Sequence, residues 1–381
     1  MFVLITLGVL LFGIKFAPRG TFHEDSFSVG QTRALKGIFA LAVMFHHLYS
    51  YLLPSFLSLK YFRDVGFLMV GGFFLISGYG LMYGVKNKSK YLKGFFVKRI
   101  LPLILAYYVI DIFYIALKYL TPNMDMETFK FYLKESIFGL QLWFVPVMIL
   151  LYVLFRISFI GHDKRKNKII SPVILTSLIL VYIALFTYTQ HLSIDGRAVN
   201  DRYGCQWNDT VLCFAVGMWY CIVKDKINSF LKKFYYPVTV VALVLFGYLF
   251  IKVLRLPPYV WPTAPDYLII REICAVMFCL VTILLSMKVR IGNGLLNFCG
   301  DHSYEIYLSH AIFISILRWG TMLFLPGDPI VYVQSDDLFA AGVIICTFIF
   351  SFVVHKLCGF ILKPLKKGAV NKGSKKEKAK A

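Results

Sequence analysis

The chain consists mainly of apolar stretches that are about as long as a lipid bilayer is thick. Of its 381 residues, 59% are hydrophobic and only 16% are charged, and the mean hydropathy is +0.70. Soluble domains carry about 25% charged residues, and about 20 apolar residues suffice for a membrane-spanning helix. The sequence therefore predicts an all-α fold, a polytopic transmembrane helix bundle of about 11 spans. We place these spans at 2–16, 34–53, 65–84, 98–120, 141–160, 171–189, 209–223, 235–253, 268–286, 303–323 and 338–362.

The basic residues, which give a net charge of +21, alternate between the loops. Six loops carry 29 Lys and Arg residues, and the five loops between them carry 9. The positive-inside rule assigns the basic set to the cytoplasm. We therefore expect a multi-pass protein of the cell membrane with its N-terminus outside and its C-terminus inside, in contact with the lipid bilayer and not with nucleic acid.

Composition divides the chain into three parts. Residues 1–33 are predicted to be an N-terminal anchor span with a cytoplasmic connector, because no basic residue precedes the first apolar run. Residues 34–362 form the membrane domain. Residues 363–381 are a basic cytoplasmic tail, predicted to be disordered and held near anionic lipid headgroups. The eight cysteines are scattered without metal-binding spacing, so no metal site is predicted.

The most informative stretch is RALKGIFALAVMFHH at 33–47, which places ionisable residues inside an apolar helix. Such groups are costly at hydrocarbon depth and indicate a functional site. At 100° per residue, Lys36 and His47 lie about 20° apart and share one helix face. His46 points about 100° away from His47. We therefore predict that His47 is the reactive histidine and that His46 is a hydrogen-bonded packing residue.

Four more motifs follow: FFLISGY at 73–79, KRILP at 98–102, LWF at 142–144 and GDHSYEIYLSHAIF at 300–313. Together with the spacing of Lys36 and His47, they resemble the acyltransferase 3 family of polytopic membrane proteins. That family usually has Arg where this chain has Lys36. Arg33, one turn earlier and about 40° from the His47 face, could share the role of Lys36.

The resemblance covers about 34–362 and implies ten core helices. It implies a membrane O-acyltransferase that moves an acyl group, most often acetyl, from cytoplasmic acetyl-CoA or another acyl-CoA to a hydroxyl of an envelope glycan or sugar-containing acceptor. His47 would be the general base or a transient acyl carrier. The basic side chains Arg33, Lys36, Lys98 and Arg99 would bind the phosphates of coenzyme A. The residues expected to line the site are Ser77, Tyr79, Trp143, Tyr304, Glu305 and His310.

Asp111 is a further ionisable residue inside a predicted span. Counted from the cytoplasmic end, Asp111 lies about 18 Å deep, and His47 lies at a similar depth in its own helix. A carboxylate at that depth could orient the imidazole and stabilise its protonated form. A bond from Asp111 to a Tyr or Lys elsewhere in the bundle is the competing interpretation.

Three other functions fit part of the pattern. A transporter of glycans or small molecules would also place charges at mid-membrane, but it would not consume acetyl-CoA. Another class of polytopic histidine acyltransferase, acting on lipids or proteins, would require different motifs. A purely structural scaffold would leave His47, Asp111, Glu305 and His310 without a purpose. The outer segment 191–209 is rich in residues that can bind sugar hydroxyls, although any outer loop contains such residues.

Overall fold

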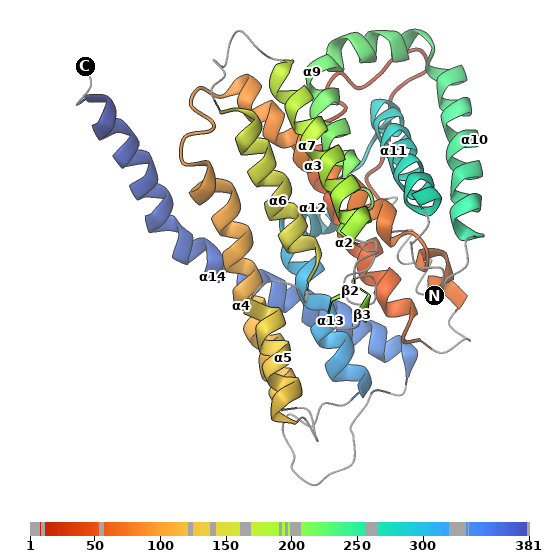
Figure 1. Ribbon diagram of the computed structural model, residues 1–381. Coiled ribbons are helices and arrows are strands. Elements are labelled where there is room, and N and C mark those ends of the chain that lie inside the picture. Colours follow the sequence, from red (N-terminus) through yellow and green to blue (C-terminus); the bar gives the residue numbers. More distant parts are fainter. Residues whose placement is uncertain are drawn as a thin grey trace.

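The structure is a computed structural model in which nearly all secondary structure is helical (Figure 1). It describes residues 8, 12–52, 57–120, 125–137, 142–160, 169–189, 193–194, 197–198, 207–255, 265–319, 333 and 335–378. The α-helices are α2 (Val29–Tyr49), α3 (Gly66–Asn87), α4 (Leu101–Tyr119), α5 (Met126–Ile137), α6 (Phe144–Ser158), α7 (Ile170–Thr189), α9 (Leu212–Lys233), α10 (Tyr235–Leu254), α11 (Pro265–Lys288), α12 (Gly294–Asp301), α13 (Ser303–Trp319) and α14 (Asp336–Lys378). Two short helices, η1 (Leu57–Phe62) and η2 (Phe96–Ile100), precede α3 and α4.

The predicted helical bundle is confirmed as a fold class. Every expected span from 34–53 onward contains a helix. Among the described residues, six helices are long and apolar enough to cross a membrane, and α6 and α13 are shorter apolar helices. These findings establish a polytopic bundle, and the span count of eleven stays a prediction.

The predicted first span, 2–16, lies largely outside the described residues. Its end is not helical, because Lys15–Phe16 forms a short strand, β1, that pairs antiparallel with β4 (Val289–Arg290). The charge of Lys15 ends the apolar run, and pairing with β4 satisfies the backbone groups there. A second two-residue ribbon, β2 (Ser193–Ile194) with β3 (Arg197–Ala198), lies in the predicted outer segment, most of which the structure does not describe.

Glycines bring the central helices together. The most extensive contact of α3 is with α9, where a Cβ on Gly78 would collide with the carbonyl of Phe214 and one on Gly217 with the carbonyl of Leu75. Gly72 faces Phe39 on α2. Small residues allow such close helix approach in lipid. The glycines of α3 therefore pack against both α2 and α9.

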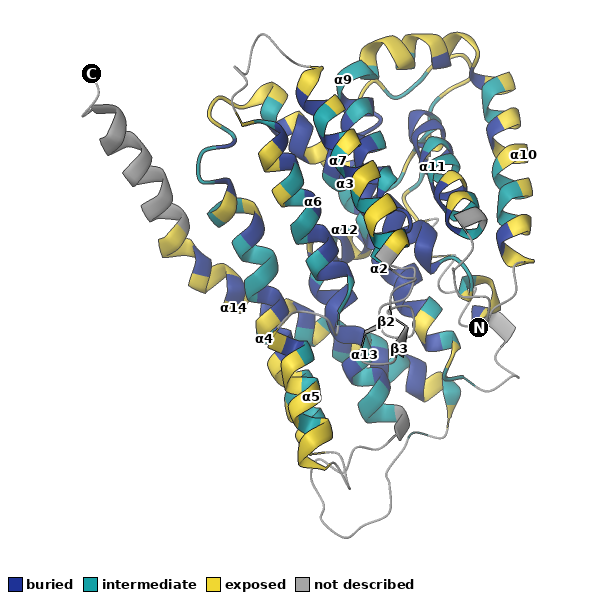
Figure 2. Ribbon diagram, in the orientation of Figure 1, coloured by how far each residue is buried: buried dark blue, intermediate teal, exposed yellow. Residues whose placement is uncertain are grey.

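The outer helices expose apolar side chains, as expected for contact with lipid. In Figure 2, α3 is mostly buried whereas α10 is largely exposed. The exposed residues of α10 include Val240, Val241, Val244, Leu245 and Ile251. An exposed apolar surface of this extent marks a membrane or protein interaction site.

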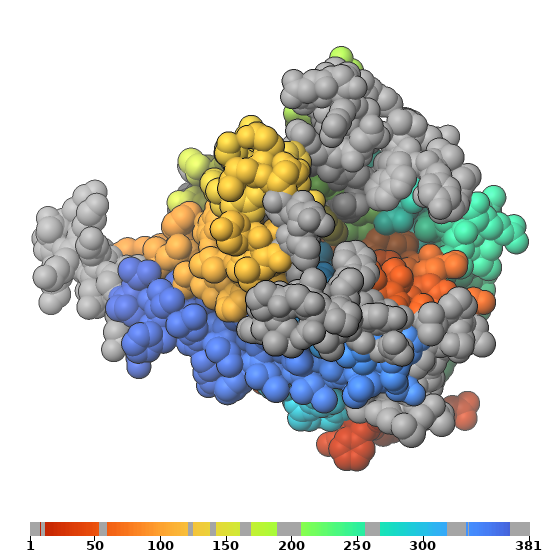
Figure 3. Space-filling model, turned by 90° about the horizontal axis from the view of Figure 1, so that it is seen from below, coloured from red at the N-terminus to blue at the C-terminus, as the bar shows by residue number. Residues whose placement is uncertain are grey.

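Two features differ from the predicted organisation. Helix α5 lies in a segment that we took for an outer loop, and it packs on α4 through Tyr107 and Tyr108, whose hydroxyls donate to the carbonyls of Ser136 (3.0 Å) and Ile137 (2.7 Å). A search for apolar spans does not detect this helix, because it contains several charged residues. Helix α14 continues to Lys378 and therefore overlaps the tail that was predicted to be disordered. Seen from below, α5 (yellow) and α14 (blue) border one side of the molecule (Figure 3).

Candidate functional site

The candidate site contains two histidine rings from the first and the last motif. Helix α2, capped by the Ser28 side chain, which accepts from the backbone N–H of Gln31 (3.2 Å), carries His47 near its end. Helix α13 packs against α2 and carries His310. The ring centroids of His47 and His310 lie 5.0 Å apart. The fold thus brings the two motifs together.

His47 and His310 differ in their surroundings. His47 is exposed, although Leu48 beside it on α2 is fully buried. His310 is buried, and its Nδ1 lies 3.0 Å from the carbonyl oxygen of Ile306. Because a carbonyl only accepts, this bond assigns the proton of His310 to Nδ1. Nε2 of His310 is then an unprotonated acceptor, buried and without a hydrogen-bond partner in the described part of the chain.

The face shared by Lys36 and His47 turns toward α12 and α13. Lys36 is half-buried and interacts electrostatically with Asp301, Glu305, Arg33 and Arg99. Nε of Arg33 lies 3.0 Å from the carboxylate of Asp301. Two of the other predicted basic residues, Arg33 and Arg99, thus lie within electrostatic range of Lys36, together with Glu305 and with Asp301, which the prediction did not include.

His46 faces another part of the bundle, as the helical geometry predicts. Its ring lies 4.9 Å from that of His47, but its Nδ1 donates to the carbonyl of Phe62 (3.3 Å) on η1. His46 also lines a cavity at the start of α3. It is hydrogen-bonded as predicted, and its role stays a prediction.

In the described structure Asp111 is bound to α5, and its predicted partnership with His47 stays a prediction. The buried carboxylate of Asp111 accepts a hydrogen bond from the Ser136 hydroxyl on α5, and the Tyr107 hydroxyl donates to the carbonyl of the same serine. Depth counted along each helix could not reveal that α5 returns along α4 and covers Asp111. The competing interpretation, a bond elsewhere in the bundle, describes the structure better.

Glu305 is also bound away from the histidine pair. Its carboxylate accepts from Nδ1 of His355 on α14 at 2.9 Å, and the ring of His355 lies 4.7 Å from that of His302. The sequence analysis missed His355, although it is an ionisable residue inside a predicted span and therefore meets the criterion that selected His47. Tyr304 donates to the carbonyl of Leu103 at 3.0 Å and so joins α13 to α4.

The other basic residues lie at the entry to α4. Arg99 is exposed on η2, with its guanidinium 5.2 Å from the ring centroid of Tyr91. Nζ of Lys98 donates to the carbonyl of Lys93 (3.1 Å). Of these two, Arg99 is the one that acts on Lys36 electrostatically.

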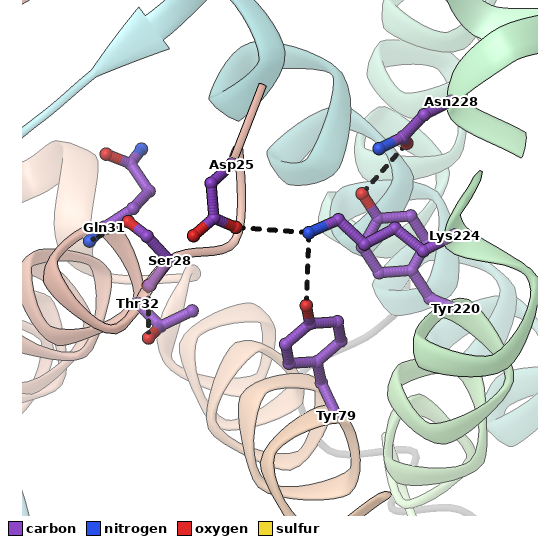
Figure 4. A network of polar contacts seen from close by, with 8 residues as sticks. All are labelled: Asp25, Ser28, Gln31, Thr32, Tyr79, Tyr220, Lys224 and Asn228. Atoms are coloured by element: carbon purple, nitrogen blue, oxygen red, sulfur yellow. Dashed lines mark hydrogen bonds and ion pairs between the residues drawn. The ribbon is translucent and has the colours of Figure 1, made fainter. Parts of the chain in front are cut away.

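The hydroxyls of the FFLISGY motif serve two different contacts. Ser77 is hydrogen-bonded to Tyr152 on α6, a residue that also lies in the field of Arg99. The Tyr79 hydroxyl lies 3.4 Å from Nζ of Lys224, and Lys224 lies 3.2 Å from the carboxylate of Asp25, as Figure 4 shows. Ser77 thus lies beside the basic group, whereas Tyr79 belongs to a separate network between α3 and α9.

Trp143 precedes α6 and is half-buried. The neighbouring residue Phe144 joins the LWF motif to the core. Phe144 is buried, and its ring centroid lies 5.5 Å from that of Phe74, on which it stacks, and 4.7 Å from that of Tyr307. Motifs from α3, α6 and α13 therefore meet in one aromatic cluster. Within the described residues, no group of His, Cys, Asp and Glu is arranged to hold a metal ion.

The helical bundle and these motifs define a membrane protein with the architecture of a polytopic acyltransferase. The profile of the acyltransferase domain matches residues 32–356, and the chain therefore belongs to the acyltransferase 3 family. The predicted resemblance is thus confirmed over most of the chain. No curated protein and no solved structure matches it.

Proposed function

We propose that this membrane acyltransferase moves an acyl group, most simply acetyl, from cytoplasmic acyl-CoA to a hydroxyl of an envelope glycan or another sugar-containing acceptor. The observation that carries the proposal is the approach of His47 to His310, 5.0 Å between ring centroids. An exposed imidazole beside a second, buried imidazole can take a proton from a hydroxyl and release it again. The pair joins the first and the last of the motifs, which lie far apart in the sequence.

In the proposed reaction, His47 takes the proton from the acceptor hydroxyl while the hydroxyl oxygen attacks the thioester carbonyl carbon of acyl-CoA. The C–O bond forms, the C–S bond breaks, and the proton held by His47 passes to the leaving thiolate. General base catalysis of this kind contributes about 10² to 10⁴ in rate. A two-step route, in which His47 carries the acyl group transiently, uses the same residue.

His310 is proposed to position His47 in the role that the sequence analysis gave to Asp111. The bond from Nδ1 of His310 to Ile306 fixes the ring and directs a lone pair on Nε2 away from that bond. A ring fixed in this way restricts the orientation of the imidazole beside it, as the third member of a catalytic triad does.

The group around Lys36, with Arg33 and Arg99, is proposed to bind the phosphates of acyl-CoA. Arg is well suited to phosphate because its guanidinium donates two parallel hydrogen bonds. This proposal requires the basic end of the bundle to face the cytoplasm, as the charge of the loops predicts. A reporter fused after Lys380 should then be active only inside the cell, and activity outside would contradict the orientation.

The test of the proposed function is acetyl transfer by membranes that contain the protein. Vesicles with wild-type protein should release CoA from acetyl-CoA and add acetyl groups to envelope glycans, as mass spectrometry would detect. Vesicles with His47→Ala at equal abundance should do neither. Movement of glycan without consumption of acetyl-CoA would instead identify a transporter and overturn the proposal.

A further inference from the structure

A cavity of about 480 Å³ opens beside His46, at the end of the bundle opposite to the basic group. Its volume falls within the range of about 300 to 1,000 Å³ that is usual for ligand sites. It lies where η1 and the start of α3 meet the end of α10 and the start of α11. In Figure 3, η1 (orange-red) and α10 (green) reach the surface on the same side of the molecule. The lining residues are His46, Arg63, Asp64, Gly66, Phe67, Val253, Leu254, Tyr267 and Arg271.

The wall nearest the histidine pair is the ring of His46. Its Nδ1 is bound to the carbonyl of Phe62, so Nε2 is the nitrogen that remains as an acceptor. The ring lies directly over Gly66, where a Cβ atom would come within 2.8 Å of the His46 Cδ2. Glycine therefore makes room for this ring. Because the ring of His46 lies 4.9 Å from that of His47, a molecule in the cavity is one side chain away from the proposed base.

The wall formed by α11 is held by a buried ion pair. Nη2 of Arg271 lies 2.6 Å from the carboxylate of Asp209, whose side chain is only 2% exposed. The guanidinium of Arg271 also lies 4.2 Å from the ring centroid of Phe67. Nη1 of Arg271 also lies 3.4 Å from the hydroxyl of Tyr267. An arginine fixed in this way holds this wall of the cavity in place, which lowers the entropy lost when a ligand binds.

The chemistry of the lining fits a ligand with many hydroxyl groups. Arg63, Asp64 and Arg271 supply donors and acceptors, while Phe67 and Tyr267 supply aromatic surface. A sugar ring presents hydroxyls at its edge and C–H groups on its faces, so it can use both kinds of wall. A long acyl chain fits this lining less well, because it would have to lie against three charged side chains.

We propose that this cavity is the acceptor site, in which a sugar residue is held so that one hydroxyl passes His46 and reaches His47. This inference rests on the proposed function and adds the location of the acceptor. Donor and acceptor then approach the histidine pair from opposite ends of the bundle. In this arrangement His46 is a positioning residue for the acceptor and takes no part in proton transfer.

Neighbouring residues at the end of α10 allow a matched test. Leu254 lines the cavity, whereas Arg255 is exposed and is not part of its lining. Leu254→Cys and Arg255→Cys would each be made in a Cys205→Ser background. Cys205 lies outside the described residues, and its removal ensures that the reagent cannot act there. Right-side-out vesicles loaded with radiolabelled acetyl-CoA would be treated with a membrane-impermeant trimethylammonium methanethiosulfonate, and mass spectrometry would confirm the modification.

Modified Leu254→Cys should transfer at least about tenfold less acetyl to envelope material, and dithiothreitol should restore the transfer. Modified Arg255→Cys and the parent should change by less than about twofold. Binding of acetyl-CoA to the purified proteins, measured by calorimetry, should stay the same. Normal transfer by modified Leu254→Cys, or failure of the reagent to reach Cys at 254 from outside, would overturn the acceptor site alone. A parent that does not consume acetyl-CoA would overturn the proposed function as well.

Discussion

Lys36 and His47 lie at two ends of one face of α2, and their polar surroundings differ. Around Lys36, the cations Arg33 and Arg99 are accompanied by the carboxylates of Asp301 and Glu305. Around His47, the described contacts are two other imidazoles, those of His46 and His310. Compensated charges can remain ionised and bind a charged ligand. Imidazoles can accept and release a proton, so they suit the chemical step. In the proposed function, one helix face thus separates binding of the donor from catalysis.

Replacement of His47 should have the largest effect. We expect His47→Ala to lower the kcat of acetyl transfer by about 10² to 10⁴, because it removes the proposed base. Abundance in the membrane should not change, since His47 is exposed. His46→Ala is the matched control on the next residue of the same helix, and it should retain most of kcat while the acceptor KM rises. An active His47→Ala together with an inactive His46→Ala would reverse the two roles.

His310 provides the next largest test, because it distinguishes positioning from packing. We expect His310→Ala to lower kcat by about tenfold to a hundredfold and to leave the KM of acetyl-CoA unchanged. The pH dependence of kcat should also change, since a neighbour that orients His47 affects its titration. His310→Gln, which keeps a polar side chain of similar reach, should restore part of the rate. A lower protein yield with a normal kcat would show that His310 only packs.

A smaller and different effect is expected at the basic end. Arg99→Ala should raise the KM of acetyl-CoA by about tenfold and leave the acceptor KM unchanged, because a lost phosphate contact weakens binding of the donor alone. Lys88→Ala in the preceding loop is the control, since Lys88 is also basic and exposed. Equal effects of the two substitutions would indicate a general influence of positive charge. An unaltered donor KM in Arg99→Ala would leave Arg99 as a topology signal only.

The sequence predicts which residues share a helix face, but not which helices pack together. Helical periodicity placed Lys36 and His47 on one face and His46 on another, because the geometry of a single helix is fixed by spacing. The motifs identified His310 and the family. Contacts between helices could not be read in this way. Nothing local shows that α5 returns to Asp111, or that His355 binds Glu305, because both contacts depend on how separate helices pack.

Asp111 should give the smallest effect on turnover, and it tests the reassignment of its partner. Its carboxylate is hydrogen-bonded to Ser136, so Asp111→Asn should disturb the contact between α4 and α5 and not the histidine pair. A hydrogen bond between membrane helices contributes about 0.6 kcal/mol on average, and a loss of that order in unfolding free energy is expected. Ser136→Ala, which removes the donor, should cause at least as large a loss, and the double variant should lose less than the sum because both changes act on the same bond. Turnover should change by less than about twofold in all three variants. A tenfold fall in kcat for Asp111→Asn, with Ser136→Ala normal, would instead show that the carboxylate acts on His47. The surroundings of His47 would then include a carboxylate, as those of Lys36 do.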